Sequence, residues 1–204
     1  RSLDKGETWK ALSGDLTKGG KEGDVPFGTL TTIDESPLKF GLLYVGTDDG
    51  LIHVSKDGGY TFTLLSAKLP KGLYVSRVLA SAYSESRVYA TMNGYRNDHF
   101  NAYVYQSDDY GTTWKQIMKD LPSEPVNVIK EDAVSDKVLY VGTDGGLYVS
   151  LDGGNSSMAW NKGLPASVPV PDLEIHPRDN EIVLGTHGRS LYVAKLEALR
   201  KLVK

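Results

Sequence analysis

The chain has 204 residues, enough for one or two domains, and its 23 lysines and arginines against 26 aspartates and glutamates give a formal net charge of −3. This balance excludes the basic surface expected of a protein that binds nucleic acid or an anionic membrane. The absence of cysteine excludes disulfides, thiol chemistry and cysteine-ligated zinc. No apolar stretch approaches the ~18 residues of a membrane span, and no signal peptide is recognisable, so the sequence leaves the compartment open.

Strands dominate the predicted elements, because β-branched and aromatic residues alternate with polar ones between turn signals. A turn and a strand over residues 8–12 come first, followed by a polar, glycine-rich connection over residues 13–27. Three four-stranded units are then predicted. The strands of the first unit cover residues 28–33, 42–47, 51–55 and 61–65, and those of the second cover residues 76–82, 87–91, 102–107 and 113–117. The strands of the third unit cover residues 126–130, 138–143 and 147–150 and a stretch around Trp160. A fourth unit has strands over residues 172–175, 181–186 and 191–194, and residues 195–202 have the spacing of a short helix.

One phrase, S-x-D-x-G-x-T-[WF], separates the third and fourth strands of the units and is clearest over residues 55–62. Its aspartates stand at positions 4, 57, 109 and 152, a spacing close to the roughly 40–50 residues of a propeller blade. The glycine supplies a positive φ, and the aspartate accepts hydrogen bonds from backbone N–H groups of the turn. We therefore interpret the phrase as a structural hairpin turn rather than a catalytic or calcium site. Its aspartates and aromatics are Asp4 and Trp9, Asp57 and Phe62, Asp109 and Trp114, and Asp152 and Trp160.

Four antiparallel strands per unit predict an all-β chain with the fold of a β-propeller. Residues 1–195 would supply three full blades, three strands of a last blade and a lone outer strand at the start. Residues 196–204 would form a short C-terminal helical tail. The lone strand either closes a four-bladed ring against residues 191–194 or, as we favour, belongs to the preceding blade of a larger propeller. A fragment of this kind exposes strand edges, so we expect pairing with the remaining blades of a longer chain, or edge-to-edge self-association.

The repeated phrase resembles the Asp-box, or BNR, repeat of sialidases, sortilin-type receptors and xyloglucan-degrading glycosidases. The resemblance extends to residues 43–50 (LYVGTDDG), residues 139–150 (LYVGTDGGLYVS) and the stretch from His176 to Arg189. These segments are similar to bacterial proteins catalogued as BNR-repeat glycosyl hydrolases or sortilin-like propeller proteins, and the chain resembles their C-terminal portion. The resemblance implies a propeller fold and an exported protein that is periplasmic, bound to the cell surface or secreted.

The candidate ligand site lies on one face of the predicted propeller. In a blade, the turns between the second and third strands share a face with the blade-to-blade linkers, and the repeated phrase lies on the opposite face. Near the axis the first face is concave, which favours ligand binding. Its turns are residues 48–50, 93–99, 144–146 and 187–189, joined by the linkers 71–74, 123–127 and 167–172. The candidate ligand-binding residues are Asp48, Asp49, Tyr95, Arg96, Asp98, His99, Asp144, His187 and Arg189.

Each candidate also has a purely structural interpretation. Asp-Gly turns such as those at Asp49 and Asp144 are common in tight hairpins, and Arg189 could pair with a neighbouring carboxylate. The loop over residues 93–99 is longer than its equivalents, which is typical of functional loops but also fits a solvated surface loop. His176 and His187 are expected at opposite ends of the blade, so we predict no metal site. No cofactor is predicted, because nucleotide-binding and similar motifs are absent from the sequence.

Two functions fit these residues. The first, which we favour, is a non-catalytic module that binds a protein, peptide or glycan ligand, because no specific catalytic signature accompanies the repeats. The second is part of a glycoside hydrolase acting on polysaccharide, which needs two carboxyl groups about 5–5.5 Å apart for retention or about 6.5–9.5 Å apart for inversion. A sialidase is disfavoured, since only Arg96 and Arg189 are placed to hold a substrate carboxylate. A rigid platform for assembly is a third function that the sequence does not exclude. The carboxylates available to a hydrolase are Asp48, Asp49, Asp98 and Asp144.

Overall fold

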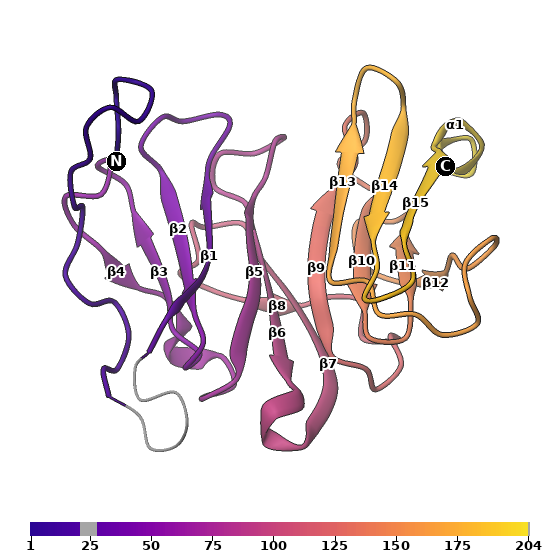
Figure 1. Ribbon diagram of the computed structural model, residues 1–204, viewed down its shortest axis with the longest axis horizontal. Helices are drawn as coiled ribbons and strands as arrows, with labels where there is room; N and C mark the ends of the chain where they lie inside the picture. Colours follow the sequence, from indigo (N-terminus) through magenta and orange to yellow (C-terminus); the bar gives the residue numbers. More distant parts are fainter. Residues whose placement is uncertain (21–27, 204) are drawn as a thin grey trace.

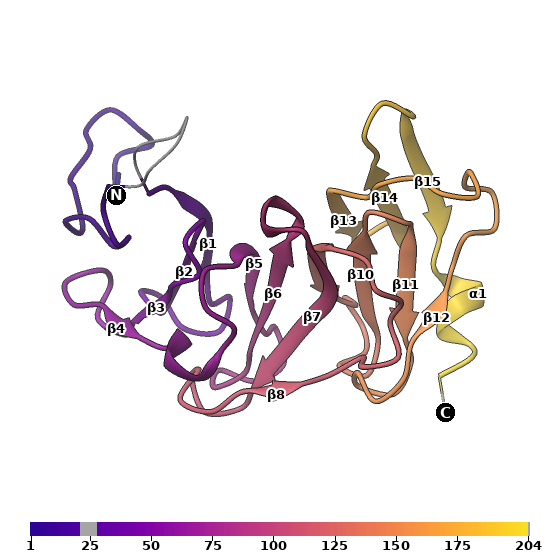
Figure 2. The same cartoon turned by 90° about the horizontal axis from the view of Figure 1, so that it is seen from below.

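The computed structural model describes residues 1–20 and 28–203, and the chain folds into four antiparallel sheets that follow one another in sequence order. Three of these sheets have four strands and the last has three. Figure 1 shows the sheets standing side by side, and Figure 2 shows the first and last sheets at opposite ends of the row. Each sheet is one blade of a β-propeller, so the predicted all-β fold is confirmed.

Each blade runs from an inner strand to a short outer strand. Blade one consists of β1 (Leu30–Glu35), β2 (Leu43–Thr47), β3 (Ile52–Ser55) and β4 (Thr63–Leu64). Blade two consists of β5 (Tyr74–Ala80), β6 (Val88–Gly94), β7 (His99–Ser107) and β8 (Lys115–Gln116). Blade three consists of β9 (Val126–Glu131), β10 (Leu139–Thr143), β11 (Leu147–Ser150) and β12 (Met158–Ala159). Blade four consists of β13 (Asp172–His176), β14 (Glu181–Gly185) and β15 (Leu191–Lys195).

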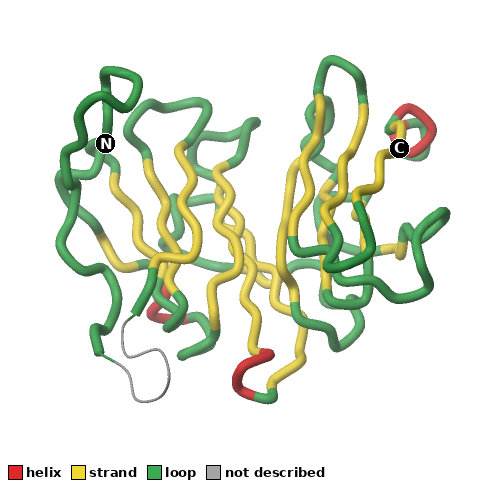
Figure 3. The backbone as a smooth tube through the Cα atoms, viewed as in Figure 1, coloured by secondary structure: helices red, strands yellow, loops and turns green. Residues whose placement is uncertain are grey.

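Helical structure is limited to three short segments in the part of the chain that the structure describes. Two are 3₁₀ turns, η1 (Ser66–Lys68) and η2 (Tyr95–Asn97), and the third is the single α-helical turn α1 (Glu197–Arg200). They are drawn in red in Figure 3. Every strand of the four predicted units is present, with ends displaced by no more than three residues. Part of the predicted connection over residues 13–27 lies outside the described residues.

Apolar side chains fill the spaces between neighbouring sheets rather than one common centre. Separate buried clusters lie between blades one and two, between blades two and three, and between blades three and four. Equivalent tyrosines of the second strands, Tyr44, Tyr89 and Tyr140, are fully buried in these clusters. The alternation of side chains along a strand explains this arrangement, because both faces of a blade pack against neighbours.

Residues 1–12 have the local geometry of an outer hairpin. The Arg1 amino group donates to Lys10 O (2.6 Å), and Lys10 N–H donates to Arg1 O (2.9 Å). These reciprocal bonds are those of an antiparallel pair, and they correspond to the pair Val54–Thr63 of blade one. The predicted strand over residues 8–12 is thus reduced to a single pair. It does not join β15, which ends a three-stranded sheet, so the four-bladed closure is not formed.

The repeated phrase forms the same hydrogen-bonded turn in residues 2–8, 55–61, 107–113 and 150–156, which we call the repeat turns. In the second copy, Ser55 Oγ donates to Asp57 Oδ1 (2.8 Å) and accepts from the N–H of Gly59 (2.7 Å). Asp57 also accepts from the N–H (3.0 Å) and the hydroxyl (2.6 Å) of Thr61. The other three copies repeat these bonds. The aspartates therefore serve their own turns.

These hydrogen bonds favour the ionised form of the aspartates. The hydroxyl and N–H of Thr61, with the Ser55 hydroxyl, hold the pKa of Asp57 well below its usual range. Asp4 is affected in the same way by its own threonine and serine. The N–H and hydroxyl of Thr113 lower the pKa of Asp109 to about 2. Partial burial opposes ionisation of Asp152, but hydrogen bonds within its turn still lower its pKa. Each turn is therefore built around a carboxylate that stays charged in mildly acidic solution.

A glycine in each of the last three repeat turns packs closely against the preceding blade or hairpin. Gly59 has a φ of 92°, and a Cβ atom there would lie 2.7 Å from the side chain of Leu12. Gly111 lies in the same way against Leu65 of blade one. A larger residue would meet both a strained backbone and a steric clash. The repeat turns thus fix the contact between successive units on this face of the molecule.

Trp160 does not occupy the position of the other aromatics of the phrase. The backbone N–H of Trp160 donates to Leu147 O (2.8 Å) in the third strand of blade three. The backbone N–H of Ile117 makes the equivalent bond to the third strand of blade two (2.9 Å). Trp160 is therefore the counterpart of Ile117, which lies three residues beyond the phrase aromatic Trp114. Ser157 stands at the aromatic position in this copy. The structure corrects the assignment of Trp160 as the fourth aromatic of the phrase.

The chain continues from β15 directly into α1, which packs against blades three and four. Its apolar side chains join the buried cluster between these blades. Arg200 Nε donates to both carboxylate oxygens of the buried Asp132 (3.1 and 3.0 Å), and Arg200 Nη1 donates to Asn180 Oδ1 (2.5 Å). Asp132 also accepts from the hydroxyl of Tyr140 (2.8 Å). This buried polar cluster anchors α1 to the turns that follow β9 and β13.

Candidate ligand-binding site

The inner strands of the first three blades share an irregularity close to the predicted site. Thr31, Ser76 and Asn127 are each skipped in the pairing of the inner strand with the second strand, which marks a β-bulge. Thr31 Oγ1 donates to Val75 O (2.6 Å) and Ser76 Oγ donates to Val126 O (2.7 Å), so the first two bulge residues reach the inner strand of the next blade. The bulges therefore bring the inner strands together around the propeller axis.

A cavity of about 480 Å³ opens where blades two, three and four meet, and we call it the axial cavity. It contains four of the predicted site residues, which come from blades two, three and four. Its lining residues are Tyr74, Asn93, Tyr95, Arg96, Asp144, Pro169 and His187. Tyr74 and Pro169 belong to linkers that the sequence placed on this face. The turns between second and third strands of blades two, three and four thus converge with these linkers, as the propeller frame predicts.

Arg96 is held by stacking rather than by an ion pair. Its guanidinium carbon lies 5.3 Å from the centroid of the Tyr74 ring. Among the described residues, no carboxylate pairs with Arg96 and no acceptor takes a hydrogen bond from it. A cation over an aromatic face is attracted by the ring quadrupole, which fixes the plane of the guanidinium. The N–H groups of Arg96 therefore remain available to an oxyanion.

A polar chain crosses from blade two to blade three at the base of the axial cavity. Asn93 Nδ2 donates to Asn127 Oδ1 (2.9 Å), and Asn127 Nδ2 donates to Asp144 Oδ1 (2.9 Å). The N–H of Asp144 donates to Pro125 O (3.1 Å), which fixes the turn. The bulge residue Asn127 thus orients Asp144. Asp144 Oδ2 has no hydrogen-bond partner among the described residues and can accept from a ligand.

The loop of η2 divides its predicted site residues between the cavity and its own support. The Tyr95 ring is 62% exposed and packs edge-on against Phe100, with ring centroids 6.2 Å apart. Asp98 ends η2 with a φ of 52° and does not line the cavity. His99 Nε2 is 2.7 Å from the hydroxyl of Tyr103, and the two rings are stacked. Asp98 and His99 therefore shape the loop that presents Tyr95 and Arg96.

Asp48 and Asp49 occupy the equivalent turn of blade one but do not line the axial cavity. They are only 9% and 7% exposed. Asp49 accepts from the N–H of Lys18 (2.7 Å) and from the hydroxyl of Thr47 (2.5 Å), and Asp48 accepts from the N–H of Thr29 (2.9 Å). Lys18 and Thr29, two described residues that precede β1, therefore lie against this turn, and both aspartates hold them in place.

The turn of blade four places His187 in the cavity wall and Arg189 outside it. His187 N–H donates to Pro169 O (3.2 Å), and its side chain is exposed. Arg189 is exposed, and in the described part of the chain it forms no ion pair, so the alternative in which it pairs with a carboxylate is not found. The sequence therefore located the turn correctly, while only one of its two side chains reaches the cavity.

A second hollow of about 280 Å³ continues from the axial cavity along the inner strands and shares Tyr74 and Asn93 with it. Arg77 lines this hollow, and its Nη2 donates to Asp172 Oδ1 (2.7 Å) of blade four. The sequence did not single out Arg77, Ser76 or Asn127. The mismatch in strand pairing that marks a bulge is visible only once the strands are aligned in space.

The described residues contain no cluster of three or more histidines, aspartates or glutamates that could hold a metal ion. None of their helices has the length and apolar character needed to cross a membrane.

Comparison with solved structures supports the assignment of the fold. The GH74 xyloglucanase from Xanthomonas campestris superposes with a TM-score of 0.64 at 17% identity, covering 80% of this chain and 29% of that one. For the GH74 enzyme from Niastella koreensis the TM-score is 0.65 at 16% identity, with 80% and 28% covered. YCF48 from Cyanidioschyzon merolae gives a TM-score of 0.51 at 16% identity, with 82% and 56% covered. No family model and no curated protein matches the sequence. The chain spans less than a third of the two GH74 enzymes, and these similarities establish the β-propeller fold.

Proposed function

We propose that the chain is part of a ligand-binding β-propeller and that its axial cavity receives a segment of a protein, peptide or glycan without catalysis by this piece alone. The observation that carries the proposal is Arg96, which is stacked on Tyr74 in the cavity wall and has no ion-pair partner among the described residues. A planar guanidinium presented in this way suits a carboxylate or another oxyanion, because it can donate two parallel hydrogen bonds.

The other groups of the axial cavity define the rest of the ligand. Tyr95 offers an exposed aromatic face on which a sugar ring or an apolar side chain can pack. Asn93 and Asp144 are held in position by the amide chain through Asn127 and provide polar groups beside it. A ligand with one acidic group and one flat apolar face fits this combination. Acidic oligosaccharides and acidic peptides have both properties.

Binding arrays test this proposal directly. The chain is applied to oligogalacturonates, neutral xylogluco-oligosaccharides, and peptides rich in glutamate or lysine, and we expect retention by the acidic members. Replacing Arg96→Gln should weaken that binding by about 10- to 100-fold, because hydrogen bonds to charged groups contribute about 1.5–3 kcal/mol. The matched control is Arg178→Gln, since Arg178 is 81% exposed on another turn and pairs with Asp179. Equal binding by the Arg96→Gln variant and the parent would contradict the proposal.

The likeness to GH74 enzymes keeps a glycoside hydrolase as the second candidate function. Such an enzyme needs two carboxyl groups across a cleft. Among the described residues, the axial cavity has one carboxylate in its lining, Asp144. A hydrolysis screen on polysaccharides, made with this chain and with any longer parent, separates the candidates. Turnover that is abolished by Asp144→Asn would favour the hydrolase over the binding module.

We also propose that the chain belongs to an exported bacterial protein of the BNR-repeat or sortilin-like type and forms blades near its C-terminal end. The support is the resemblance of the repeated phrase and of residues 139–150 to such proteins. Cell fractionation with an antibody against this chain is the test. Detection in the periplasm, at the surface or in the medium is expected, and detection in the cytoplasm alone would contradict the proposal.

A further inference from the structure

The second hollow beside the axial cavity differs from the cavity in charge, and we call it the inner hollow. Arg77 in its lining is neutralised by Asp172, because Arg77 Nη2 donates to Asp172 Oδ1 (2.7 Å). Arg96 in the axial cavity has no such partner among the described residues. The polar lining residues of the inner hollow are Thr31, Tyr74, Ser76, Arg77, Asn93 and Asn127. In the described part of the chain, the inner hollow therefore presents hydrogen-bonding groups but no unpaired charge.

The two asparagines of the inner hollow retain unused hydrogen-bond donors. A side-chain amide carries two N–H donors. Asn93 uses one of them toward Asn127 Oδ1 (2.9 Å), and Asn127 uses one toward Asp144 Oδ1 (2.9 Å). The second N–H of each amide has no hydrogen-bond partner among the described residues. A ligand oxygen can therefore accept a hydrogen bond from either amide.

The hydroxyl groups of the inner hollow can still accept hydrogen bonds. Thr31 Oγ1 donates to Val75 O (2.6 Å), and Ser76 Oγ donates to Val126 O (2.7 Å). A hydroxyl oxygen has two lone pairs, so both oxygens keep one that can accept, although Ser76 Oγ also contacts Thr91 Oγ1 (2.8 Å). Donors and acceptors thus lie together. A sugar hydroxyl can use both kinds, whereas a carboxylate, which only accepts, leaves the hydroxyl oxygens unpaired.

The same two hydroxyls make the channel wall a poor partner for a peptide backbone. An extended peptide binds along a strand by pairing its N–H and C=O groups with those of the strand. On β5 and β9, the carbonyls of Val75 and Val126 already accept from Thr31 and Ser76. At these positions the wall presents side chains rather than a free strand edge. This favours a sugar over a peptide in the inner hollow.

The inner hollow is bordered by blades that this chain itself supplies. Thr31 of blade one donates to the inner strand of blade two, and Ser76 of blade two donates to the inner strand of blade three. The inner hollow shares Tyr74 and Asn93 with the axial cavity. A ligand anchored at Arg96 can therefore extend past Tyr74 into the inner hollow.

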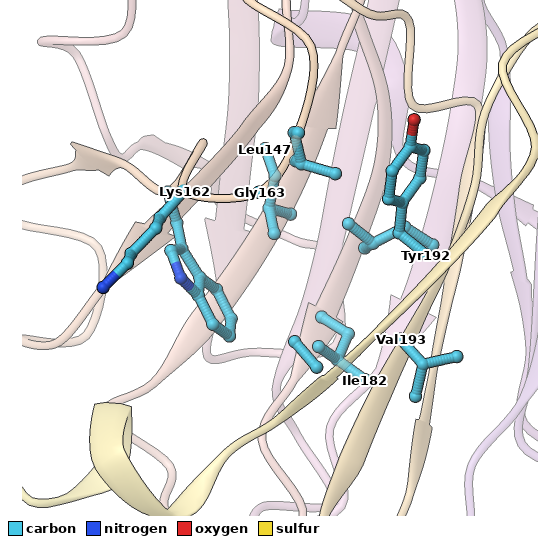
Figure 4. A pocket seen from close by; sticks show the side chains of 10 residues that line it. Leu147, Lys162, Gly163, Ile182, Tyr192 and Val193 are labelled. Carbon is cyan, nitrogen blue, oxygen red and sulfur yellow. The ribbon is translucent and has the colours of Figure 1, made fainter.

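The apolar cleft between blades three and four offers no comparable set of polar groups. Its volume is about 100 Å³, and Figure 4 shows Leu147 on one side of the cleft, with Ile182 and Tyr192 of blade four across from it. A hydroxyl placed among such apolar groups loses its hydrogen bonds to water, which costs free energy. A sugar therefore finds its hydrogen-bonding partners near the propeller axis rather than in this cleft.

We propose that the axial cavity and the inner hollow together hold two consecutive units of an acidic oligosaccharide, a uronic acid at Arg96 and a neutral sugar in the inner hollow. This inference rests on the proposed function of the axial cavity. The uronate carboxylate accepts from the Arg96 guanidinium, and a hydroxyl of the same unit donates to Asp144 Oδ2. The hydroxyls of the neutral unit bond to the amides and hydroxyls of the inner hollow. A second carboxylate there would be opposed by Asp172, which already neutralises Arg77.

Titration calorimetry with defined saccharides tests the order of affinities. The probes are disaccharides in which a uronic acid is linked to xylose, galactose or rhamnose, together with the free uronic acids, digalacturonate and a diglutamate peptide. At least one mixed disaccharide should bind ~10-fold more tightly than its free uronic acid, because the neutral unit adds hydrogen bonds. It should also bind more tightly than digalacturonate and the peptide. Equal affinities for the mixed disaccharides and the free acids, or a preference for digalacturonate or the peptide, overturn the proposal.

The variant Asp172→Asn tests the neutral character of the inner hollow. It leaves Arg77 without its carboxylate, so a second acidic unit becomes favourable there. Digalacturonate should bind ~3- to 10-fold more tightly to this variant than to the parent, while the best mixed disaccharide should change by less than ~2-fold. Asp179→Asn is the matched control, because it also removes a carboxylate that pairs with an arginine, on another turn. An unchanged affinity for digalacturonate, or an equal gain in both variants, overturns the proposal.

Arg96→Gln separates failure of this inference from failure of the proposed function. Where both hold, the variant loses affinity for the free uronic acids and for the disaccharides alike. Where Arg96→Gln weakens binding of the free acids but a neutral unit adds no affinity in the parent, the axial cavity binds acids and the assignment of the inner hollow is wrong. Where the variant binds every acidic probe as the parent does, the proposed function itself fails.

Discussion

The two ends of each blade differ in whether the same side chains recur from blade to blade. At one end the repeat turns make the same bonds between serine, aspartate and threonine in every copy. At the other end the equivalent turns carry two aspartates in blade one, Tyr95 and Arg96 in blade two, Asp144 in blade three and His187 in blade four. Side chains that recur in each copy meet a requirement of the fold. Side chains that change from blade to blade are free to meet the requirements of a ligand.

The same contrast holds within the end of the molecule that contains the axial cavity. Asp49 in blade one and Asp144 in blade three stand at corresponding turns, but Asp49 is buried by the segment before β1 while Asp144 lines the axial cavity. Residue type alone therefore does not make a site. What covers the turn decides whether its carboxylate can reach a ligand.

The largest expected effect concerns the buried contact between Arg200 of α1 and Asp132 of blade three. Asp132→Asn leaves the Arg200 guanidinium, only 13% exposed, without its carboxylate. We expect a loss of about 3–5 kcal/mol in the free energy of unfolding, because removing one partner of a buried ion pair leaves an uncompensated charge. Denaturant unfolding measures this loss. Asp136→Asn is the control, since Asp136 is exposed and lies 3.9 Å from Arg87, and it should cost less than ~1 kcal/mol.

Truncating a repeat-turn serine should have the next largest effect. Ser107→Ala removes the acceptor of the Gly111 N–H and one donor to Asp109. An unsatisfied buried N–H costs about 1–3 kcal/mol. Thermal unfolding should show this loss, whereas Ser123→Ala, on an exposed linker, should not. Full stability of the Ser107→Ala variant would contradict the structural role assigned to the turns.

Acid should weaken the end that carries the repeat turns. The pKa of Asp109 is about 2 in the folded chain against an ordinary value of 3.8. A carboxylate with a lowered folded pKa stabilises the fold above the unfolded pKa, and this contribution is lost as the pH falls from about 4 towards 2. Unfolding of the parent and of Asp109→Asn across this range is the measurement. Their difference in stability should narrow as the pH falls, and a constant difference would be inconsistent with the lowered pKa.

The smallest effect on stability is expected at the axial cavity. Tyr95→Ala truncates a ring that is 62% exposed, so the free energy of unfolding should change by less than ~0.5 kcal/mol. Affinity for oligogalacturonate should nevertheless fall on the order of 2- to 10-fold, since aromatic contacts contribute about 0.5–1.5 kcal/mol. Titration calorimetry alongside a melting curve separates the two quantities. A large drop in melting temperature would assign Tyr95 to the core instead.

The sequence predicted the frame of the molecule better than its details, for physical reasons. Alternating side chains and the repeated phrase are local signals, so the strands and their turns could be located along the chain. The phrase also brought Tyr95, Arg96 and Asp144 to one face. Burial of Asp48 and Asp49 could not be predicted, because it depends on how a distant segment packs.

Two further features of the structure were hidden from the sequence. The last copy of the phrase has Ser157 at its aromatic position, so the nearest tryptophan, Trp160, was assigned to the phrase. In the structure Trp160 is the residue after the outer strand, and its backbone N–H donates to Leu147 O. The bond between Arg200 and Asp132 joins residues 68 positions apart, and no local pattern reports such a contact. Both depend on distances in space rather than on spacing along the chain.

The ion pair between Arg77 and Asp172 connects two inner strands that are not neighbours. It joins the inner strand of blade two to the inner strand of blade four, across the inner strand of blade three. Both side chains are partly exposed, so the pair can open at little cost in free energy. The distance between Arg77 and Asp172 therefore reports the spacing of the two inner strands. Measured before and after a longer chain adds its blades, it would show whether that spacing changes.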